Sequence, residues 1–284
     1  MSTSDAYKAW IGKTEEASDK ARPSDRVRFE AIFGSDAAKS SDVLSPLAHW
    51  MLFPAIVPQD GIGPDGHPKR GGFLPPFDHL PRRMWTGGRL TFHAPVKVGD
   101  DLVRRSTIKS INEKAGGSGE LVFVTVAHTV FDEQGAILIE EEQELVYRGM
   151  GSGSTPPGAP TADAAVSLTS IPDPVLLFRY SAVTFNGHRI HYDRKYAVEE
   201  ERYRGLVVHG PLVATMLLRT ACQTAGDADP VRFQFRASSP AFDGEPLTFR
   251  ATRPDGDGVV KCWASNAEDQ LVMSAEAAFP LRRG

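Results

Sequence analysis

The sequence predicts an α+β fold of two similar halves, with two antiparallel sheets that each wrap around a central helix. Three observations support this prediction. Strand-like alternation of apolar and polar residues recurs in both halves at a fixed offset, a segment rich in Gly, Pro and Ser separates the halves, and one long stretch is apolar on nearly every side.

The first half begins with two segments of helical character. Residues 3–21 have a composition typical of a helix, and residues 45–53 predict a short buried helix with Ser45 as its cap and Pro46 in its first turn. Gly and Pro then recur over residues 54–81, which predicts a long ordered loop or lid.

Paired strands are expected in both halves, because apolar and polar residues alternate with period two between clusters of turn residues. The alternating segments are residues 89–111 and 121–148 in the first half, and residues 231–253 and 259–282 in the second. Their turn glycines, Gly99 and Gly244, are 244 − 99 = 145 positions apart. We therefore interpret the chain as a duplicated unit.

Two helices are expected in the second half. Residues 193–204 are charged and amphipathic, and Asp193 suits an N-cap. Residues 210–225 are apolar almost all round, so this helix should be buried beneath its sheet.

A linker is predicted at residues 149–174, where Gly, Ser, Pro and Ala dominate and charge is nearly absent. It divides the chain into a first half at residues 1–148 and a second half at residues 175–284. The first half contains no second copy of the histidine-rich segment described below. We therefore expect one active site per chain, with the first half shaping the pocket.

Bulk composition excludes several classes of protein. The 284 residues have a net charge of −4, which argues against non-specific nucleic-acid binding. The two cysteines, Cys222 and Cys262, belong to no metal-binding pattern, so we expect neither a metal nor a disulfide framework. The sequence has no membrane-length apolar run and its N-terminus is polar, so we expect a cytoplasmic protein that binds no membrane.

The segment 178–212 concentrates groups suited to acid–base chemistry. It contains Asn186, His188, His191 and His209, the last of which precedes Gly210. Histidine titrates near neutral pH, and a backbone amide beside glycine is a common donor to a developing oxyanion. The segment therefore predicts proton transfer next to a carbonyl group.

Two strings in this segment resemble the motif of the MaoC-like hydratases and dehydratases, a family with the hot-dog fold. Residues 186–193 read NGHRIHYD and residues 205–210 read GLVVHG. The form FNGHRIHYD, with residues 66–76 and 80–100 of the first half, resembles the double hot-dog branch of type 2 hydroxyacyl-thioester dehydratases and itaconyl-CoA or mesaconyl-C4-CoA hydratases. The resemblance covers nearly the whole chain after Ser45 and implies a double hot-dog fold.

The resemblance also implies roles for three residues. His191 would be the general base that acts on water, and the Gly210 amide would donate to the thioester carbonyl. Asn186 stands where the family has a catalytic Asp, and an amide cannot accept a proton as a carboxylate does. Our hypothesis is that Asn186 orients the water. The structural alternatives are a histidine at a helix entrance for His191 and turn residues for Asn186 and Gly210.

Substrate contacts are expected from six further residues. Guanidinium groups suit carboxylates and phosphates, and aromatic side chains suit an acyl channel. The candidates are His188, Arg189, His209, Arg70, Arg83 and Phe73. For each arginine a structural charge is the alternative, and for Phe73 it is core packing. Arg189 departs from the family, which has proline there.

We expect an acyl-CoA hydratase or dehydratase, a hydro-lyase that prefers a short dicarboxylic enoyl-CoA such as itaconyl-CoA or mesaconyl-C4-CoA. The alternatives are a 3-hydroxyacyl-thioester dehydratase of fatty-acid synthesis, a non-catalytic acyl-CoA-binding module and, less favoured, a thioesterase. No cofactor is expected beyond the CoA of the substrate, because the sequence has no metal-ligand spacing and no Gly-rich dinucleotide loop. The expected partners are an acyl-CoA thioester and a second copy of the chain.

Overall fold

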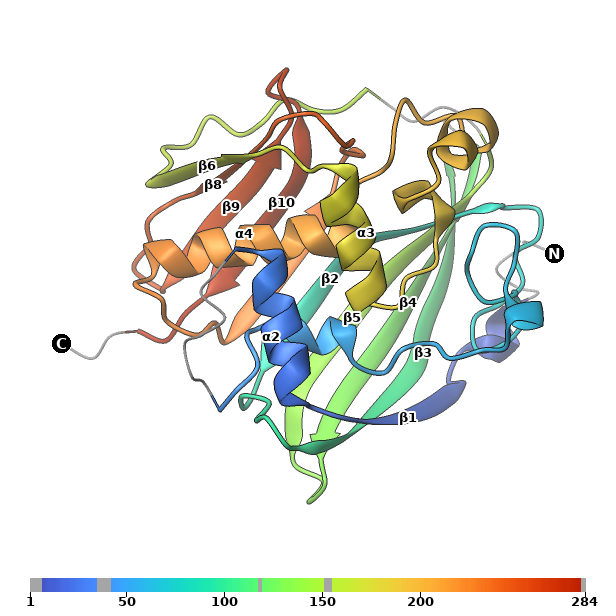
Figure 1. The fold of residues 1–284 in the computed structure, drawn as a ribbon, viewed down its shortest axis with the longest axis horizontal. Coiled ribbons are helices and arrows are strands. Elements are labelled where there is room, and N and C mark those ends of the chain that lie inside the picture. The colour runs from blue at the N-terminus through green and yellow to red at the C-terminus, as the bar shows by residue number, and fades with distance from the viewer. Residues whose placement is uncertain (1–6, 35–41, 117–118, 151–154, 282–284) are drawn as a thin grey trace.

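The computed structural model describes residues 7–34, 42–116, 119–150 and 155–281. The strands within these residues are β1 (Thr14–Lys20), β2 (Arg82–Phe92), β3 (Asp101–Gly116), β4 (Gly119–Asp132), β5 (Ile137–Arg148), β6 (Val166–Ser170), β7 (Arg232–Ala237), β8 (Leu247–Ala251), β9 (Val259–Ser265) and β10 (Leu271–Ala278). They form one ten-stranded sheet in the order β1-β3-β4-β5-β2-β7-β10-β9-β8-β6 (Figure 1). Every named pair of neighbouring strands is antiparallel.

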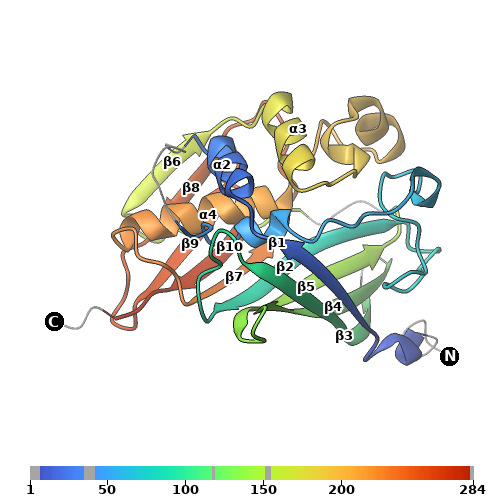
Figure 2. The ribbon, with the colours of Figure 1, turned by 60° about the horizontal axis from the view of Figure 1, so that its bottom comes forward.

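Helices cover one face of this sheet, as Figures 1 and 2 show from two directions. The α-helices of the described chain are α2 (Pro23–Ile32), α3 (Pro174–Val183) and α4 (Gly210–Thr224). The short helices are η1 (Lys8–Trp10), η2 (Ala48–Met51), η3 (Gln59–Gly61), η4 (Arg189–His191) and the π-helical turn η5 (Tyr196–Glu200). The long helix α4 packs against the second-half strands β7 to β10, and α2 packs against α3.

The two halves join where β2 pairs with β7, so their sheets merge into one instead of remaining separate. Two glycines make this close pairing possible. A Cβ on Gly87 would lie 2.8 Å from the carbonyl oxygen of Phe235, and one on Gly88 would lie 3.0 Å from the Phe235 ring. Glycine is therefore required at the joint, because a side chain there would push the two strands apart.

Among the residues that the structure describes, the expected central helix is present in the second half only. The buried face of α4 belongs to the main hydrophobic core, with Leu212, Val213, Leu217 and Leu218 nearly inaccessible to water. In the first half, η2 and α2 lie at the corresponding face in place of a long helix. The fold class is as predicted, but the duplication is asymmetric.

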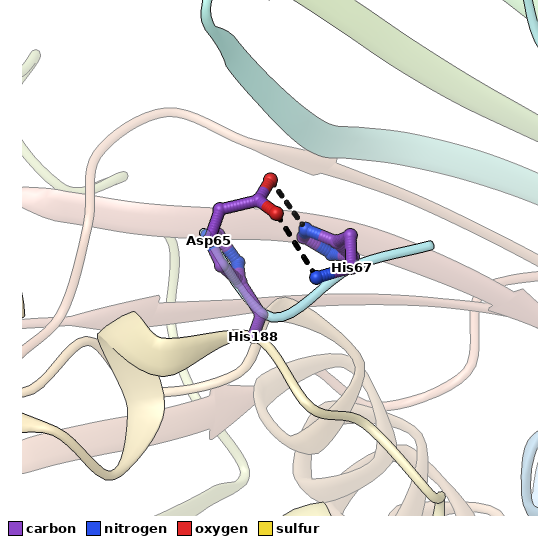
Figure 3. A group of neighbouring side chains, drawn as sticks. All are labelled: Asp65, His67 and His188. Carbon is purple, nitrogen blue, oxygen red and sulfur yellow. Dashed lines mark hydrogen bonds and ion pairs between the residues drawn. The ribbon is translucent and has the colours of Figure 1, made fainter. Parts of the chain in front are cut away.

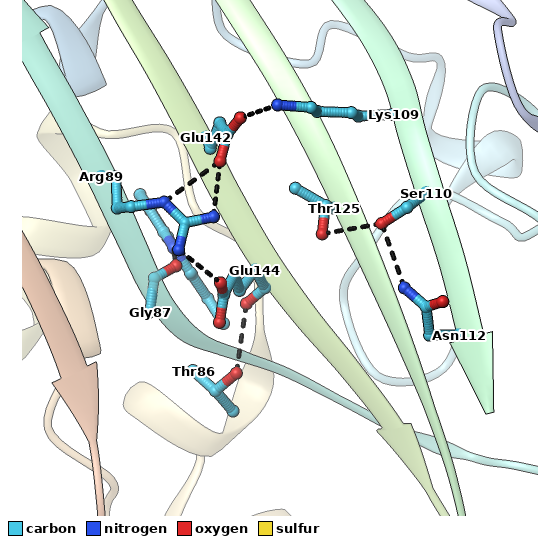
Figure 4. A network of polar contacts seen from close by, with 10 residues as sticks. Thr86, Gly87, Arg89, Lys109, Ser110, Asn112, Thr125, Glu142 and Glu144 are labelled. Atoms are coloured by element: carbon cyan, nitrogen blue, oxygen red, sulfur yellow. Dashed lines mark hydrogen bonds and ion pairs between the residues drawn. The ribbon is translucent and has the colours of Figure 1, made fainter. Parts of the chain in front are cut away.

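The outer face of the first-half strands is polar. Figure 4 shows Arg89 of β2 bonded to Glu142 and Glu144 of β5, while Lys109 of β3 bonds to Glu142. Ser110 donates a hydrogen bond to Thr125 across the next strand pair, at 3.1 Å. Exposed ion pairs of this kind contribute little stability each, so the network indicates a solvated face.

Several predicted elements are confirmed. The helix at residues 210–225 is α4, and the turn glycines Gly99 and Gly244 both have positive φ angles, 106° and 74°. The alternating segments contain β2 to β5 and β7 to β10. Asp193 accepts a hydrogen bond from the backbone N–H of Tyr196 at 3.1 Å, as expected of an N-cap. The amphipathic helix predicted over residues 193–204 is wrong in length, because the structure has only the five-residue π-helical turn η5 there.

Three further predictions of local structure are wrong in part. The helix expected over residues 3–21 is wrong for residues 14–20, which form the edge strand β1 because pairing with β3 satisfies their backbone groups. Residues 3–6 of that prediction lie outside the described chain. The helix at residues 45–53 is the four-residue η2, preceded by Leu47 in the left-handed region. The predicted linker contains β6, which pairs with β8, while its residues 151–154 lie outside the described chain.

Candidate active site

His191 lies at the end of η4 and is 7% exposed. Its Nδ1–H donates a hydrogen bond to the carbonyl oxygen of Val207 at 2.7 Å. Because a carbonyl can only accept, the proton must be on Nδ1, which leaves the Nε2 lone pair available. Burial, and to a smaller extent the nearby His67, lower the pKa of His191 to about 4 against the opposing effect of the Val207 bond. The ring is therefore neutral at physiological pH, with its lone pair on Nε2.

His209 stacks directly on His191, with ring centroids 3.7 Å apart and an interplanar angle of 18°. It is completely buried, and a 2.8 Å hydrogen bond joins its Nε2 to Oγ of Ser181 on α3. Burial holds the pKa of His209 well below the usual value, as do the charges that His191 and His188 would carry if protonated. His209 is fully buried and packs against one face of the His191 ring. This geometry favours a packing role for His209 over substrate contact.

Asn186 holds the turn that leads to His191. Its Oδ1 accepts a hydrogen bond from the backbone N–H of His188 at 3.0 Å. The backbone N–H of Asn186 donates to the carbonyl oxygen of Ser181 at 2.8 Å. Phe185, just before it, has φ 51°, so the turn is tight. The amide oxygen of Asn186 is therefore engaged in the turn, and the side-chain NH2 is the part that could meet a water.

A loop of the first half reaches this motif and contributes Asp65 and His67. Figure 3 shows both side chains beside His188. The Asp65 carboxylate accepts hydrogen bonds from Nδ1–H of His67 at 3.1 Å and from the backbone N–H of His67 at 3.0 Å. The His67 ring lies 4.1 Å from the His188 ring, which in turn meets the His191 ring edge-on at 5.4 Å. Four imidazoles thus form one continuous row.

The charges of this cluster follow from burial and proximity. Burial lowers the pKa of His67 and of His188 below the usual value, and Arg83 acts in the same direction on both. For Asp65, burial acts to raise the pKa, but the hydrogen bonds from His67, with the charge that His67 and His188 would carry if protonated, outweigh it and hold the pKa well below its usual range. At neutral pH the cluster therefore holds one carboxylate and neutral imidazoles.

Backbone contacts fix the first-half loop on the second-half motif. The N–H of Arg189 donates to the carbonyl oxygen of Asp65, and its guanidinium donates to that of Pro64, both at 2.9 Å. The same guanidinium is paired with Asp193 at 2.7 Å. Arg189 is thus occupied in joining the two halves, so this geometry favours a structural role over the expected substrate contact.

Arg83 of β2 lies at a small cavity beside this cluster. The residues that line the cavity are Asp65, Pro81, Arg82, Arg83, Met84, His188, Ile190, Glu201 and Tyr203. Arg82 is paired there with Glu201 at 3.0 Å. Arg83 acts electrostatically on His67 and His188, so its cation lies close to this pair of rings.

Arg70 and Phe73 lie farther along the same loop. The Arg70 guanidinium donates to three backbone carbonyls, those of Phe77, Leu80 and Pro81. Phe73 is partly buried against the smaller core cluster of the first half. Arg70 therefore stabilises the conformation of the loop. Phe73 packs against the core, which is the structural alternative stated for it above.

Gly210 is the first residue of α4, so its N–H has no acceptor within the helix. A Cβ at this position would lie 3.6 Å from the carbonyl oxygen of Trp85, in ordinary contact. His209 precedes it, and His209 is stacked on His191. A helix N-terminus favours negative charge, and this one directly follows the residue that stacks on His191.

A larger cavity lies between α2, α3 and α4 and is almost entirely apolar. Val208, Leu212 and Met216 are among its lining residues, which include no titratable side chain. It adjoins the His209–Gly210 segment through Val208 but cannot itself perform proton chemistry. The smaller cavity is lined by titratable side chains, among them Asp65, Arg83 and His188, but His191 lines neither of these two cavities.

One group in the described chain has the side chains to hold a metal ion. Single ligand atoms of Asp65, His67 and His188 all lie within 4.8 Å of one another. Sequence reasoning missed this group, because its members come from both halves of the chain. Asp65 and His67 belong to a Pro-Asp-Gly-His-Pro string whose composition is typical of a turn. Only the contact between the His67 and His188 rings in the folded chain indicates that they are part of the cluster.

Comparisons with known proteins find related sequences over most of the chain. The family model for hydroxyacyl-thioester dehydratase type 2 matches residues 47–243. The chain is 44% identical over 264 residues to a mesaconyl-C(4)-CoA hydratase of Chloroflexus aurantiacus, covering 91% of this chain and 92% of the relative. It is 28% identical over 229 residues to a mitochondrial hydroxyacyl-thioester dehydratase type 2 of Schizosaccharomyces pombe, covering 72% and 76%.

Solved structures show the same architecture. A double hot-dog protein of Mycobacterium tuberculosis aligns with a TM-score of 0.61 at 15% identity, covering 94% of this chain and 95% of that one. At this identity the match shows the fold alone, and the predicted double hot-dog fold is confirmed. Among the described residues, no helix combines the length and apolarity needed to cross a bilayer.

Proposed function

The chain belongs to the hydroxyacyl-thioester dehydratase type 2 family, and from that premise we propose that it hydrates a short dicarboxylic enoyl-CoA of the mesaconyl-C4-CoA type. It is a hydro-lyase that acts on acyl-CoA thioesters, in the hydration or the dehydration direction. The observation that supports the mechanism best is the fixed tautomer of His191, whose Nδ1–H is bound to Val207 while Nε2 stays free.

In hydration, Nε2 of His191 takes one proton from water as the oxygen bonds to the β-carbon. The electron pair of the C=C bond moves toward the thioester, whose oxygen gains negative charge beside the Gly210 N–H. His191 then returns its proton to the α-carbon, so every atom and proton is accounted for. General base catalysis contributes about 10²–10⁴-fold, and one preorganised oxyanion donor about 10²–10³-fold.

Asn186 completes the proposed set as a residue that orients the water. Its Oδ1 is committed to the backbone of His188, so the water would contact the side-chain NH2. An amide that donates to the water oxygen fits a base at His191, because it leaves both water protons free to be accepted.

The preference for a dicarboxylic acyl group is supported by Arg83 and by the 44% identity to a mesaconyl-C(4)-CoA hydratase. A guanidinium pairs well with a carboxylate in a partly buried site. The second candidate is a 3-hydroxyacyl-thioester dehydratase of fatty-acid synthesis, which the match to the Schizosaccharomyces pombe protein favours.

The remaining assignments follow from the same site. We propose that residues 175–284 provide the base and the oxyanion donor, and that residues 1–148 shape the pocket. The mechanism needs no cofactor apart from the CoA of the substrate. We also propose a cytoplasmic homodimer, since exposed sheet edges such as β1 and β6 can pair between copies.

A substrate panel tests this proposal. Purified protein is assayed for water addition to mesaconyl-C4-CoA, itaconyl-CoA, crotonyl-CoA and a long linear enoyl-CoA. The proposal predicts the highest kcat/KM for a dicarboxylic substrate. A preference for the long linear chain would support the fatty-acid alternative, and tight binding without turnover of any substrate would refute an enzyme.

A further inference from the structure

We propose that the outward face of α3 is the surface through which two copies of the chain form a dimer. Figures 1 and 2 place α3 on the outside of the helical layer, next to α2. The inference deepens the homodimer proposed above, because it names the face that the two copies share. It rests on that part of the proposed function and is independent of the reaction.

Four apolar residues form a stripe on this face. Val175, Phe178 and Phe185 are 63%, 61% and 63% exposed, and Ala182 is exposed as well. Their successive spacings of three, four and three positions are those of residues along one side of a helix. The opposite side of α3, which includes Leu177, is buried. A helix that is apolar on both sides is normally covered on both, so a second layer is expected over α3.

Phe185 provides a second, independent sign that this face is covered. It lies just past the end of α3 in the left-handed region, with φ 51°, where glycine is the usual residue. The N–H of Asn186 donates to the carbonyl oxygen of Ser181 at 2.8 Å and closes this turn. A bulky exposed aromatic side chain gains little packing here within one copy, although its backbone is strained. Such strain persists where it serves a function, and contact with a second copy is one.

The stripe matches itself under two-fold symmetry. Val175 and Phe185 lie five positions either side of Tyr180, and Phe178 and Ala182 lie two positions either side. When two α3 helices pack antiparallel about an axis level with Tyr180, each residue meets the one at equal distance on the other side, as an isologous contact requires. The large Phe178 then faces the small Ala182 of the second copy. This match favours a second copy over an unrelated protein as the occupant.

Charge does not oppose this pairing. No residue of the stripe is charged. The one charged residue of α3 is Arg179, and its guanidinium donates to the carbonyl oxygen of Ala31 on α2 at 3.1 Å. Two copies therefore bring no like charges together at the centre of the contact. Interface cores are depleted of charge and enriched in aromatic residues in the same way.

The exposed apolar area is of the size that a dimer needs. An aromatic side chain buries about 150–250 Å² in full, so the exposed parts of the stripe and of Ile171, which is 59% exposed, amount to roughly 450 Å². A standard interface takes about 800 Å² from each partner, and about 65% of a homodimer interface is apolar, which is about 500 Å². The edge strand β6 ends at Ser170, shortly before α3 begins, so this sheet edge adjoins the face.

Analytical ultracentrifugation of the full chain, without substrate, tests the inference. We expect the wild-type protein to have twice the 30.9 kDa of one chain. Phe178→Asp should raise the Kd of the dimer at least about a hundredfold, because the change occurs twice in a two-fold interface. Ile56→Asp is the matched control, since Ile56 is 78% exposed in the loop before η3, and it should leave the mass unchanged.

An exchange of sizes tests the pairing itself. Phe178→Ala leaves two small residues facing each other and Ala182→Phe leaves two large ones, so each alone should weaken the dimer. The double variant restores one large and one small residue and should return the Kd to within about tenfold of the wild-type value. Melting temperatures check that each variant is folded. As a second measurement, Phe178→Cys with Ala182→Cys should form a disulfide-linked dimer on oxidation, and the wild-type chain should not.

The inference is overturned if the wild-type protein is a monomer, if Phe178→Asp keeps the mass of the dimer, or if the exchange of sizes fails to restore it. A dimer unaffected by Phe178→Asp would place the contact at another surface, such as the β1 edge. A monomer that binds a different protein through α3 would also overturn it. An inactive wild-type dimer would refute the proposed reaction alone, whereas an active monomer would refute this inference alone.

Discussion

Gly66 and Gly187 meet backbone to backbone across the two halves of the chain. A Cβ on Gly66 would lie 1.8 Å from the carbonyl oxygen of Gly187, and one on Gly187 would lie 2.6 Å from that of Gly66. Gly66 also has φ 91°, a conformation that favours glycine. This contact brings Asp65 and His67 to the histidine motif, so the composite site depends on two residues that perform no chemistry.

The first prediction concerns this contact. Gly66→Ala should lower kcat/KM and the melting temperature together, because the new methyl cannot fit without moving the loop away from Gly187. Gly71→Ala is the matched control: Gly71 has φ 89° in the same loop, but the nearest atom to its Cβ would be 3.8 Å away. Both variants bear a backbone strain of about 1 kcal/mol. Equal losses in the two variants would contradict the packing argument.

The second prediction concerns pH. His191 must be neutral to accept a proton, and its pKa is lowered from 6.5 to about 4, so the active form persists well below neutral pH. We expect kcat/KM to stay level on the acid side until about pH 5 and to fall near pH 4. The measurement is kcat/KM across this range, with recovery of activity on return to neutral pH as a control for unfolding. An acid limb centred near 6.5 would show that the base is not buried as described.

The third prediction concerns the donor at Gly210. Gly210→Pro removes the N–H and is compatible with the first turn of a helix, so it should lower kcat by about 10²–10³-fold. Gly210→Ala keeps the N–H, and its Cβ would make an ordinary 3.6 Å contact, so it should retain most activity. Circular dichroism checks that α4 is intact in both. If the two variants were equally active, the oxyanion assignment would be wrong.

The fourth prediction concerns substrate choice. Arg83→Gln should raise KM for a dicarboxylic enoyl-CoA by about tenfold or more, while crotonyl-CoA, which has no distal carboxylate, should be little affected. Arg89→Gln on the same strand is the control, because Arg89 is paired with Glu142 on the outer face. Similar changes for both substrates would remove Arg83 from carboxylate recognition.

Much of the fold could be predicted from sequence because its signals are local. The alternation around Gly99 and Gly244 reflects side chains that point to opposite faces of a strand, and the apolar character of α4 reflects burial on most sides. The edge strands β1 and β6 could not be predicted in this way. Thr14–Lys20 is polar at nearly every position, and it is a strand because β3 offers it a partner.

The site divides along the same line. His191, Asn186 and Gly210 stand in one short motif, so residue type and spacing indicated them. Asp65 and His67 belong to the site only because Gly66 touches Gly187, a contact between segments far apart in the sequence. Arg189 was expected to contact the substrate because of its charge. In the structure its guanidinium forms an ion pair with Asp193 and donates a hydrogen bond to the carbonyl oxygen of Pro64. Pairing of this kind depends on the folded structure.

The most direct test of the account is the rate of water addition by His191→Gln. With mesaconyl-C4-CoA and wild-type protein in H2¹⁸O, mass spectrometry should find one ¹⁸O in the product at the β-carbon. The account predicts that His191→Gln, shown by melting temperature to be folded, loses this incorporation by at least about a hundredfold. Incorporation at the wild-type rate in the folded variant would contradict it.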